Sequence, residues 1–145
     1  MTRFLTTALA ALLSFTAGCS AATPPISASA ADEGLLTSLQ VTPSTDSVAF
    51  VLQVTNTLAT PVQMTFSSAQ LAEFVVTQGN REVWRWSSDM MFAQAVQNET
   101  LADGETLRVE AFWAVPERLS GPLQATGRLL AQGTGVEQTT SFSLP

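Results

Sequence analysis

The chain has 145 residues, of which 46% are hydrophobic and only 12% are charged. This length and composition predict one folded domain and exclude a disordered chain. The formal net charge is −6, from 6 basic and 12 acidic residues, and every basic residue is an arginine. Because the chain has no basic surface for a phosphate backbone, we expect no nucleic-acid partner.

The side chains that most enzymes use for nucleophilic or metal chemistry are almost missing. Histidine, tyrosine and lysine do not occur, and Cys19 is the only cysteine. This excludes Ser-His and Cys-His pairs, histidine-ligated zinc and lysine Schiff bases. The acidic residues lie in no recognisable catalytic setting. We therefore expect a protein that is not an enzyme, with no catalytic residue, no metal and no cofactor.

Residues 1–18 have the pattern of a signal peptide. Arg3 precedes an apolar run over residues 4–15, which is too short to span a bilayer. The run ends in Thr-Ala-Gly-Cys, which resembles the bacterial lipobox and predicts lipid modification of Cys19. Ordinary cleavage a few residues later, giving a secreted protein, is the alternative.

Residues 19–33 are expected to form the lipidated cysteine and a flexible tether. This segment is rich in alanine, serine and proline, with Ile26 as its one large apolar residue. The expected location is the bacterial cell envelope, where the lipid anchor holds the domain of residues 34–145 at a membrane surface.

The domain shows an apolar period of two, which predicts an all-β fold. Turn signals at Gly79-Asn80 and Asp103-Gly104 separate neighbouring segments. The pattern indicates an antiparallel, Ig-like β-sandwich. The segment of residues 91–97 fits either a short helix or a strand that pairs with residues 105–115. The eight expected strands are residues 35–41, 48–54, 61–67, 72–78, 82–87, 105–115, 123–131 and 136–144.

The least common stretch is VWRWSSDMMF, residues 83–92. Alternation places Trp84 and Trp86 on one face and Arg85 on the other. The aromatic residues fit either a core or an interaction surface. We expect residues 84–92 to bridge the two sheets. The large side chains expected in one core are Phe50, Val54, Phe66, Phe74, Trp84 and Trp113.

The segment Phe66-Ser67-Ser68 and Gln70 precede VWRWS, residues 83–87, which Phe92 follows five residues on. In the order and spacing of these short motifs, residues 48–132 resemble the BsuPI intracellular proteinase inhibitor family. Ala69 stands where the family usually has glycine, and Glu73 stands where it has aspartate. The resemblance implies a β-sandwich and, for the founding member, reversible inhibition of a serine protease. It brings no residue-level inhibitory site with it. The motif residues are Phe66, Ser67, Ser68, Gln70, Trp84, Arg85, Trp86, Ser87 and Phe92.

We therefore expect the domain to bind a protein partner, a serine protease being the expected class. Two loops are candidates for the contact, residues 87–91 and residues 116–121. The first is favoured because methionine side chains are flexible and apolar and suit a hydrophobic specificity pocket. The alternative is a structural or assembly module of the cell envelope that inhibits no protease. The residues of the favoured binding loop are Ser88, Asp89, Met90 and Met91.

Overall fold

The computed structural model of the chain describes residues 26–32 and 34–145. The predicted signal peptide, Cys19 and the first part of the predicted tether lie outside these residues. Ten strands and one short 3-10 helix follow one another along the described part of the chain. They are β1 (Ile26–Asp32), β2 (Leu35–Pro43), β3 (Ser47–Asn56), β4 (Val62–Phe66), β5 (Ala72–Gln78), β6 (Arg81–Arg85), η1 (Trp86–Asp89), β7 (Gln97–Leu101), β8 (Thr106–Ala114), β9 (Pro122–Leu129) and β10 (Glu137–Ser143).

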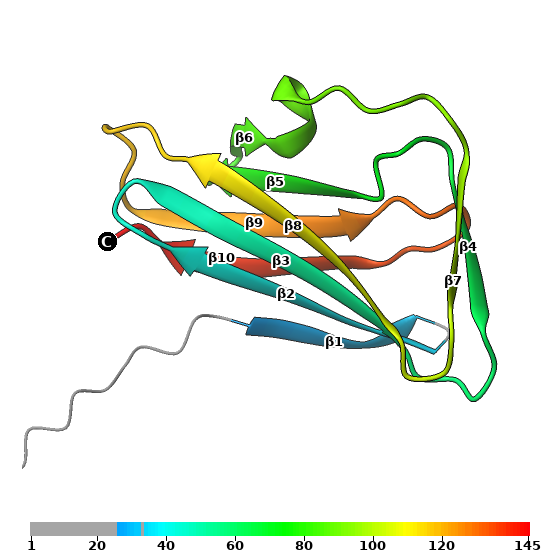
Figure 1. The fold of residues 1–145 in the computed structure, drawn as a ribbon. Helices are drawn as coiled ribbons and strands as arrows, with labels where there is room; N and C mark the ends of the chain where they lie inside the picture. The colour runs from blue at the N-terminus through cyan, green and yellow to red at the C-terminus, as the bar shows by residue number, and fades with distance from the viewer. Residues whose placement is uncertain (1–25, 33) are drawn as a thin grey trace, which may run out of the picture.

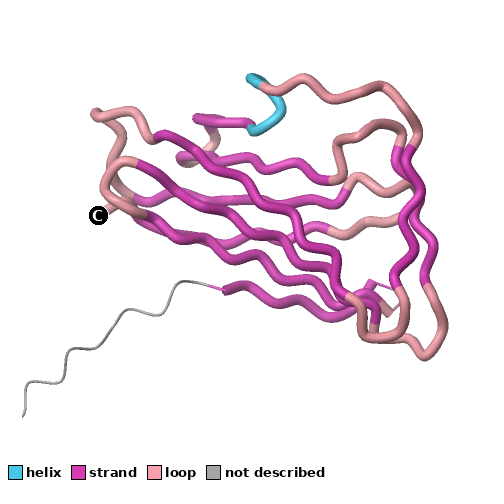
Figure 2. The backbone as a smooth tube through the Cα atoms, viewed as in Figure 1, coloured by secondary structure: helices cyan, strands magenta, loops and turns pink. Residues whose placement is uncertain are grey.

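Two four-stranded antiparallel sheets form the two layers of a sandwich (Figure 1). One sheet has the strand order β1-β2-β3-β8, and the other has the order β10-β9-β5-β6. The strands β4 and β7 form a separate antiparallel pair, which stands across one end of the sandwich (Figure 2). The predicted antiparallel β-sandwich is confirmed.

All eight predicted strands are present, with ends that differ from the prediction by two residues or fewer. The turn between β5 and β6 also forms as predicted, since Gly79 has a φ of 57°, which only glycine adopts at no steric cost. Residues 91–96 form neither a helix nor a strand. Gln97 begins β7, which pairs with β4 and not with β8.

Two strands that the sequence does not predict, β1 and β7, add to these eight. The sequence predicts a tether for residues 26–32, whereas β1 pairs with β2 from Ile26, opposite Gln40. These residues have mostly small side chains and therefore show no apolar alternation. Their pairing rests on backbone hydrogen bonds, which small residues form as well as large ones.

The core lies between the two sheets, and Phe50 of β3 connects them. Its ring lies 5.9 Å from that of Phe74 in β5 and 6.4 Å from that of Phe142 in β10, measured between centroids. Trp84 is half-buried against this core. The other five residues predicted for the core are buried, namely Phe50, Val54, Phe66, Phe74 and Trp113.

A buried polar residue, Asn56, joins the sandwich to the β4–β7 pair. Its side chain is fully buried at the end of β3. The amide nitrogen donates to the carbonyl oxygens of Thr60, Leu101 and Ala102 at 2.9 to 3.1 Å, and the amide oxygen accepts from the Leu58 N–H at 2.9 Å. A buried amide with all these partners fixes the start of β4 and the end of β7 against β3.

Candidate functional site

The β5–β6 hairpin contains a bulge that sets the directions of its side chains. Trp84 pairs with Val76 and Glu82 pairs with Thr77, so Val83 is an extra residue in β6. An extra residue shifts the alternation of a strand by one position. Glu82 and Arg85 therefore lie on the same side of β6, although they are three positions apart in the sequence.

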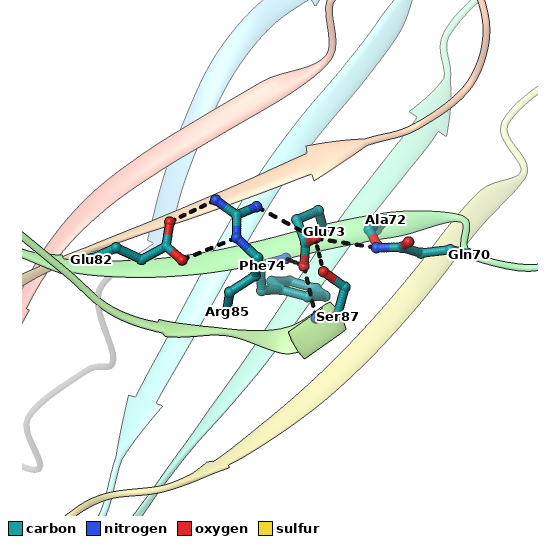
Figure 3. Close-up of polar contacts among 7 residues, drawn as sticks. All are labelled: Gln70, Ala72, Glu73, Phe74, Glu82, Arg85 and Ser87. Carbon is teal, nitrogen blue, oxygen red and sulfur yellow. Dashed lines mark hydrogen bonds and ion pairs between the residues drawn. The ribbon is translucent and has the colours of Figure 1, made fainter. Parts of the chain in front are cut away.

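The carboxylate of Glu73 is the centre of a hydrogen-bond network that joins β5 to η1 (Figure 3). The Glu73 side chain is buried, with 6% of the residue exposed. Its Oε1 accepts from the N–H of Ser87 at 3.1 Å and from the N–H of Phe74 at 3.2 Å. Its Oε2 accepts from the Ser87 hydroxyl and from the Gln70 amide at 3.3 Å.

Arg85 brings a positive charge to this network. Its Nη1 lies 3.5 Å from Glu73 Oε2, and its Nη2 lies 2.6 Å from Glu82 Oε2. The hydrogen bond from Arg85 lowers the pKa of Glu82 below that of a free glutamate, against a smaller opposing effect of burial. The same hydrogen bond raises the pKa of Arg85. Both side chains are therefore charged at neutral pH, and they hold the start and end of β6 in one orientation.

The two tryptophans of the VWRWS motif contact the core on the opposite side from Arg85. Trp84 stacks between Phe50, at 5.2 Å between centroids, and Trp113, at 5.7 Å. It thus links β6 to β3 and β8 of the other sheet. This confirms the expected bridge between the sheets at Trp84.

Trp86 begins η1 and does not extend β6, which the sequence predicts to end at Ser87. The physical reason is the Glu73 carboxylate, which takes both the N–H and the hydroxyl of Ser87 and turns the chain. The Trp86 ring contacts Phe74 at 5.6 Å and Phe92 at 5.4 Å, both edge to face. The contact between Trp86 and Phe92 therefore holds together the two ends of the segment that lies between them.

The favoured binding loop lies between these fixed points, but it is not extended throughout. Ser88 and Asp89 belong to η1, and the N–H of Met90 donates to the carbonyl oxygen of Ser87 at 3.3 Å. Met90 itself has extended backbone angles. Met90 is 46% exposed and Met91 is 99% exposed. Ser88 and Asp89 thus end a turn of 3-10 helix, and the two methionines follow it directly.

A hollow of about 300 Å³ lies beside Met90, between the two sheets. One wall comes from the β6 and η1 side, and the other comes from the end of β8, where Phe112 is 71% exposed. Met90 and Phe112 are thus the exposed large apolar side chains at this hollow. The lining residues are Trp84, Trp86, Met90, Phe112, Trp113 and Ala114.

The second candidate loop, residues 116–121, is built differently. The Leu119 N–H donates to the Pro116 carbonyl at 2.9 Å, and the Gln78 side chain donates to the Ser120 carbonyl at 2.8 Å. Leu119, its one large aliphatic side chain, packs against the core. This loop therefore offers a partner less apolar surface than residues 90–91 do.

Most of the motif residues meet around η1. Gln70, Arg85 and Ser87 contact Glu73. Phe66, Trp84 and Trp86 pack in or against the core, and Phe92 packs on Trp86. The Ser68 hydroxyl accepts from the Gln70 N–H at 3.2 Å, and Ser67 is exposed. The sequence does not predict that Glu73 is the centre of this network. It identifies Glu73 only as a residue that differs from the aspartate usual in the family.

The described residues contain neither a cluster of metal-binding side chains nor a membrane-spanning helix. No group of three or more acidic, histidine or cysteine side chains in residues 26–32 and 34–145 gathers where it could hold a metal ion. Within the same residues, no helix combines the length and the apolar character that crossing a bilayer requires.

These features define a class of β-sandwich domain in which a buried carboxylate and stacked aromatic rings fix a short exposed turn. The chain belongs to the BsuPI family of intracellular proteinase inhibitors, whose family model matches residues 35–133. No curated protein matches the chain.

Solved structures that match the chain include a β-glucosidase and two GAE domains. The β-glucosidase EmGH1 from Erythrobacter marinus is 13% identical, with a TM-score of 0.40 over 84% of this chain, which spans 16% of that enzyme. The GAE domain of GGA2p from Saccharomyces cerevisiae is 15% identical, with a TM-score of 0.29 over 83% of this chain and 98% of that domain. The GAE domain of yeast GGA1 is 11% identical, with a TM-score of 0.29 over 81% of this chain and 97% of that domain.

Proposed function

We propose that this domain inhibits a serine protease by binding it through residues 88–91, without catalysis of its own. The family supports the inhibitor role. The observation that carries the choice of contact site is the pair of exposed methionines, Met90 and Met91, at the end of η1.

The anchoring of η1 supports this role because an inhibitor segment has to be ordered before it binds. A segment that becomes ordered only in the complex loses affinity through its conformational entropy. Here Ser87 is held by Glu73 on one side, and Phe92 is held by Trp86 on the other. Packing and hydrogen bonds thus do what disulfides do in many small inhibitors.

The chemistry of the two methionines favours a protease with an apolar specificity pocket. Methionine is unbranched and adapts its shape to such pockets. A trypsin-like pocket carries an aspartate at its base and selects a basic side chain. We therefore expect inhibition of chymotrypsin-like or subtilisin-like enzymes and little effect on trypsin-like ones.

Titration of these proteases with the purified protein tests the proposal. We expect stoichiometric inhibition that is lost in Met90→Asp and in Met91→Asp, with unchanged melting temperatures. Leu58→Asp is the matched control, since Leu58 is 41% exposed in the β3–β4 connection. Cleavage between Met90 and Met91 without inhibition would contradict the proposal. Absence of both inhibition and cleavage at micromolar protein would favour a structural module of the cell envelope.

We also propose that Cys19 carries a lipid that attaches the protein to the outside of a bacterial membrane. The support is the sequence pattern of residues 1–19 alone. Radiolabelled palmitate should label the wild type and not Cys19→Ala, which should move to the soluble fraction. Unlabelled wild type that begins at Ala22 or Thr23 would indicate plain secretion.

A further inference from the structure

The last strand of one sheet, β8, has an open edge. It pairs with β3 on one side only, and no strand of the described part of the chain pairs with its other side. The Val115 N–H donates to Asp46, and the Glu105 carbonyl accepts from Asn56, both at 2.9 Å. Because the direction of backbone groups alternates along a strand, the N–H and C=O groups of residues 106, 108, 110 and 112 point away from β3.

Exposed edges are templates for pairing with another chain, and charges on them often prevent it. The β8 edge has two charges on its solvent face, Arg108 and Glu110, whose Nε and Oε1 atoms lie 2.6 Å apart. The two side chains are 47% and 46% exposed. Charges of one sign would repel a second copy in every register. Two opposite charges that lie two residues apart repel a second copy in the registers that place like charges opposite each other. They attract it in the register that places each charge opposite its counterion.

We propose that two copies of this protein associate through antiparallel pairing of their β8 edges, with Val109 at the two-fold axis. In this register Arg108 faces Glu110 of the second copy, and Glu110 faces its Arg108. Residues 108 and 110 both have outward backbone groups, so each pair exchanges two backbone hydrogen bonds. The two β1-β2-β3-β8 sheets would join into one sheet of eight strands.

Charge complementarity selects this register over its neighbours. Shifting the axis by one residue toward the C-terminus places Glu110 opposite Glu110, and shifting it toward the N-terminus places Arg108 opposite Arg108. Like charges directly opposite each other destabilise a strand pair, and opposite charges stabilise it. The register that satisfies the charges is thus the symmetric one that a closed dimer requires.

The apolar residues of β8 fit the same register. Phe112, which is 71% exposed, faces Thr106 of the second copy on the solvent side. On the inner side, Leu107 faces Ala111, and Val109 faces Val109 of the second copy. Leu107 and Val109 are only partly buried against the core of their own copy. Pairing would therefore cover apolar surface on both faces of the sheet.

Phe112 also borders the hollow beside Met90. A dimer and a protease complex would therefore compete for the surface around Phe112. The test therefore changes the two charges and leaves Phe112 in place.

Sedimentation equilibrium of the purified full chain up to about 0.5 mM tests the proposal, since an interface of one strand pair is small and weak. The wild-type mass is expected to rise toward twice that of one chain. Arg108→Glu and Glu110→Arg should each weaken association about tenfold or more, since each places like charges opposite at two symmetric positions.

Mixing the two single variants is the decisive step. One chain then has two glutamates at these positions and the other has two arginines, so the mixture should form a heterodimer. The double variant Arg108→Glu/Glu110→Arg should dimerise like the wild type. Because both side chains lie on the surface, we expect the variants to keep the melting temperature of the wild type. Unchanged melting temperatures would show that weaker association does not come from misfolding.

Three results would overturn the dimer. One is a wild type that stays monomeric throughout the concentration range. Another is a dimer that neither single variant weakens. The third is a monomer whose protease affinity falls in the single variants, which would assign the β8 edge to an extended segment of the protease.

Discussion

Replacing Glu73 with alanine removes the acceptor that holds η1 against β5. Three donors lose their acceptor in Glu73→Ala: the Ser87 N–H, the Ser87 hydroxyl and the Phe74 N–H. Arg85 keeps its stronger contact with Glu82, and the Gln70 amide keeps the Ala72 carbonyl at 3.1 Å. The loss is therefore concentrated where β5 meets Ser87.

The size of the effect follows from these donors. A buried donor left without an acceptor costs about 1–3 kcal/mol. Ser87 is half-buried, so water replaces part of what its two groups lose. We expect Glu73→Ala to lower the free energy of unfolding by about 2–4 kcal/mol. For a domain of this size each kcal/mol corresponds to about 4–8 °C in melting temperature.

Urea unfolding, followed by tryptophan fluorescence, measures this change. The matched control is Glu117→Ala, which removes the same charge from an exposed position and should change stability by less than about 0.5 kcal/mol. The Glu73→Ala/Ser87→Ala double variant should be less destabilised than the sum of the two single variants, because they share one contact. A Glu73→Ala protein within about 0.5 kcal/mol of the wild type would refute the role given to the carboxylate.

Two further predictions concern β6. Trp84→Ala removes the ring stacked on Phe50 and Trp113 and should lower the free energy of unfolding by about 3 kcal/mol. This is the lower end of the usual range because the ring is only half-buried. A melting temperature within a few degrees of the wild type would place the ring on the surface. Glu82 has a lowered pKa in the folded state, so its stabilising effect is present above the pKa of the unfolded chain, about 4.3, and is lost as the pH falls through the folded pKa. The difference in urea midpoint between the wild type and Glu82→Gln should therefore shrink toward zero below about pH 4, and a difference that grows on acidification would contradict the assignment.

The sequence predicts the strands well where one face of a strand meets the core. Along β3, Val48, Phe50, Leu52 and Val54 alternate with partly exposed residues. Burial on one face imposes this period of two. The Gly79 turn is equally predictable because its positive φ limits the choice of residue.

The period of two carries no information where a backbone contact or a single polar group decides the structure. The strand β1 pairs through its backbone, and its small side chains leave no alternation to detect. The helix η1 forms because Glu73, fourteen residues before Ser87, supplies a buried acceptor. Asn56 fixes the β4–β7 pair by donating to the carbonyl groups of Leu101 and Ala102. These groups are distant in the sequence and come close only through the pairing of the strands. Such long-range polar contacts become visible only once the fold is known.

Several of the residues that carry the family resemblance hold the turn in place. Arg85 and Ser87 point to Glu73, and Trp86 packs on Phe74 and Phe92. Met90 and Met91, by contrast, follow the turn and are 46% and 99% exposed. The family pattern therefore includes residues that fix η1, while Met90 and Met91, which we propose as the contact with a protease, lie outside that pattern. The family therefore supports the general inhibitor role that we propose. The type of protease that we expect depends instead on Met90 and Met91, which the family pattern does not include.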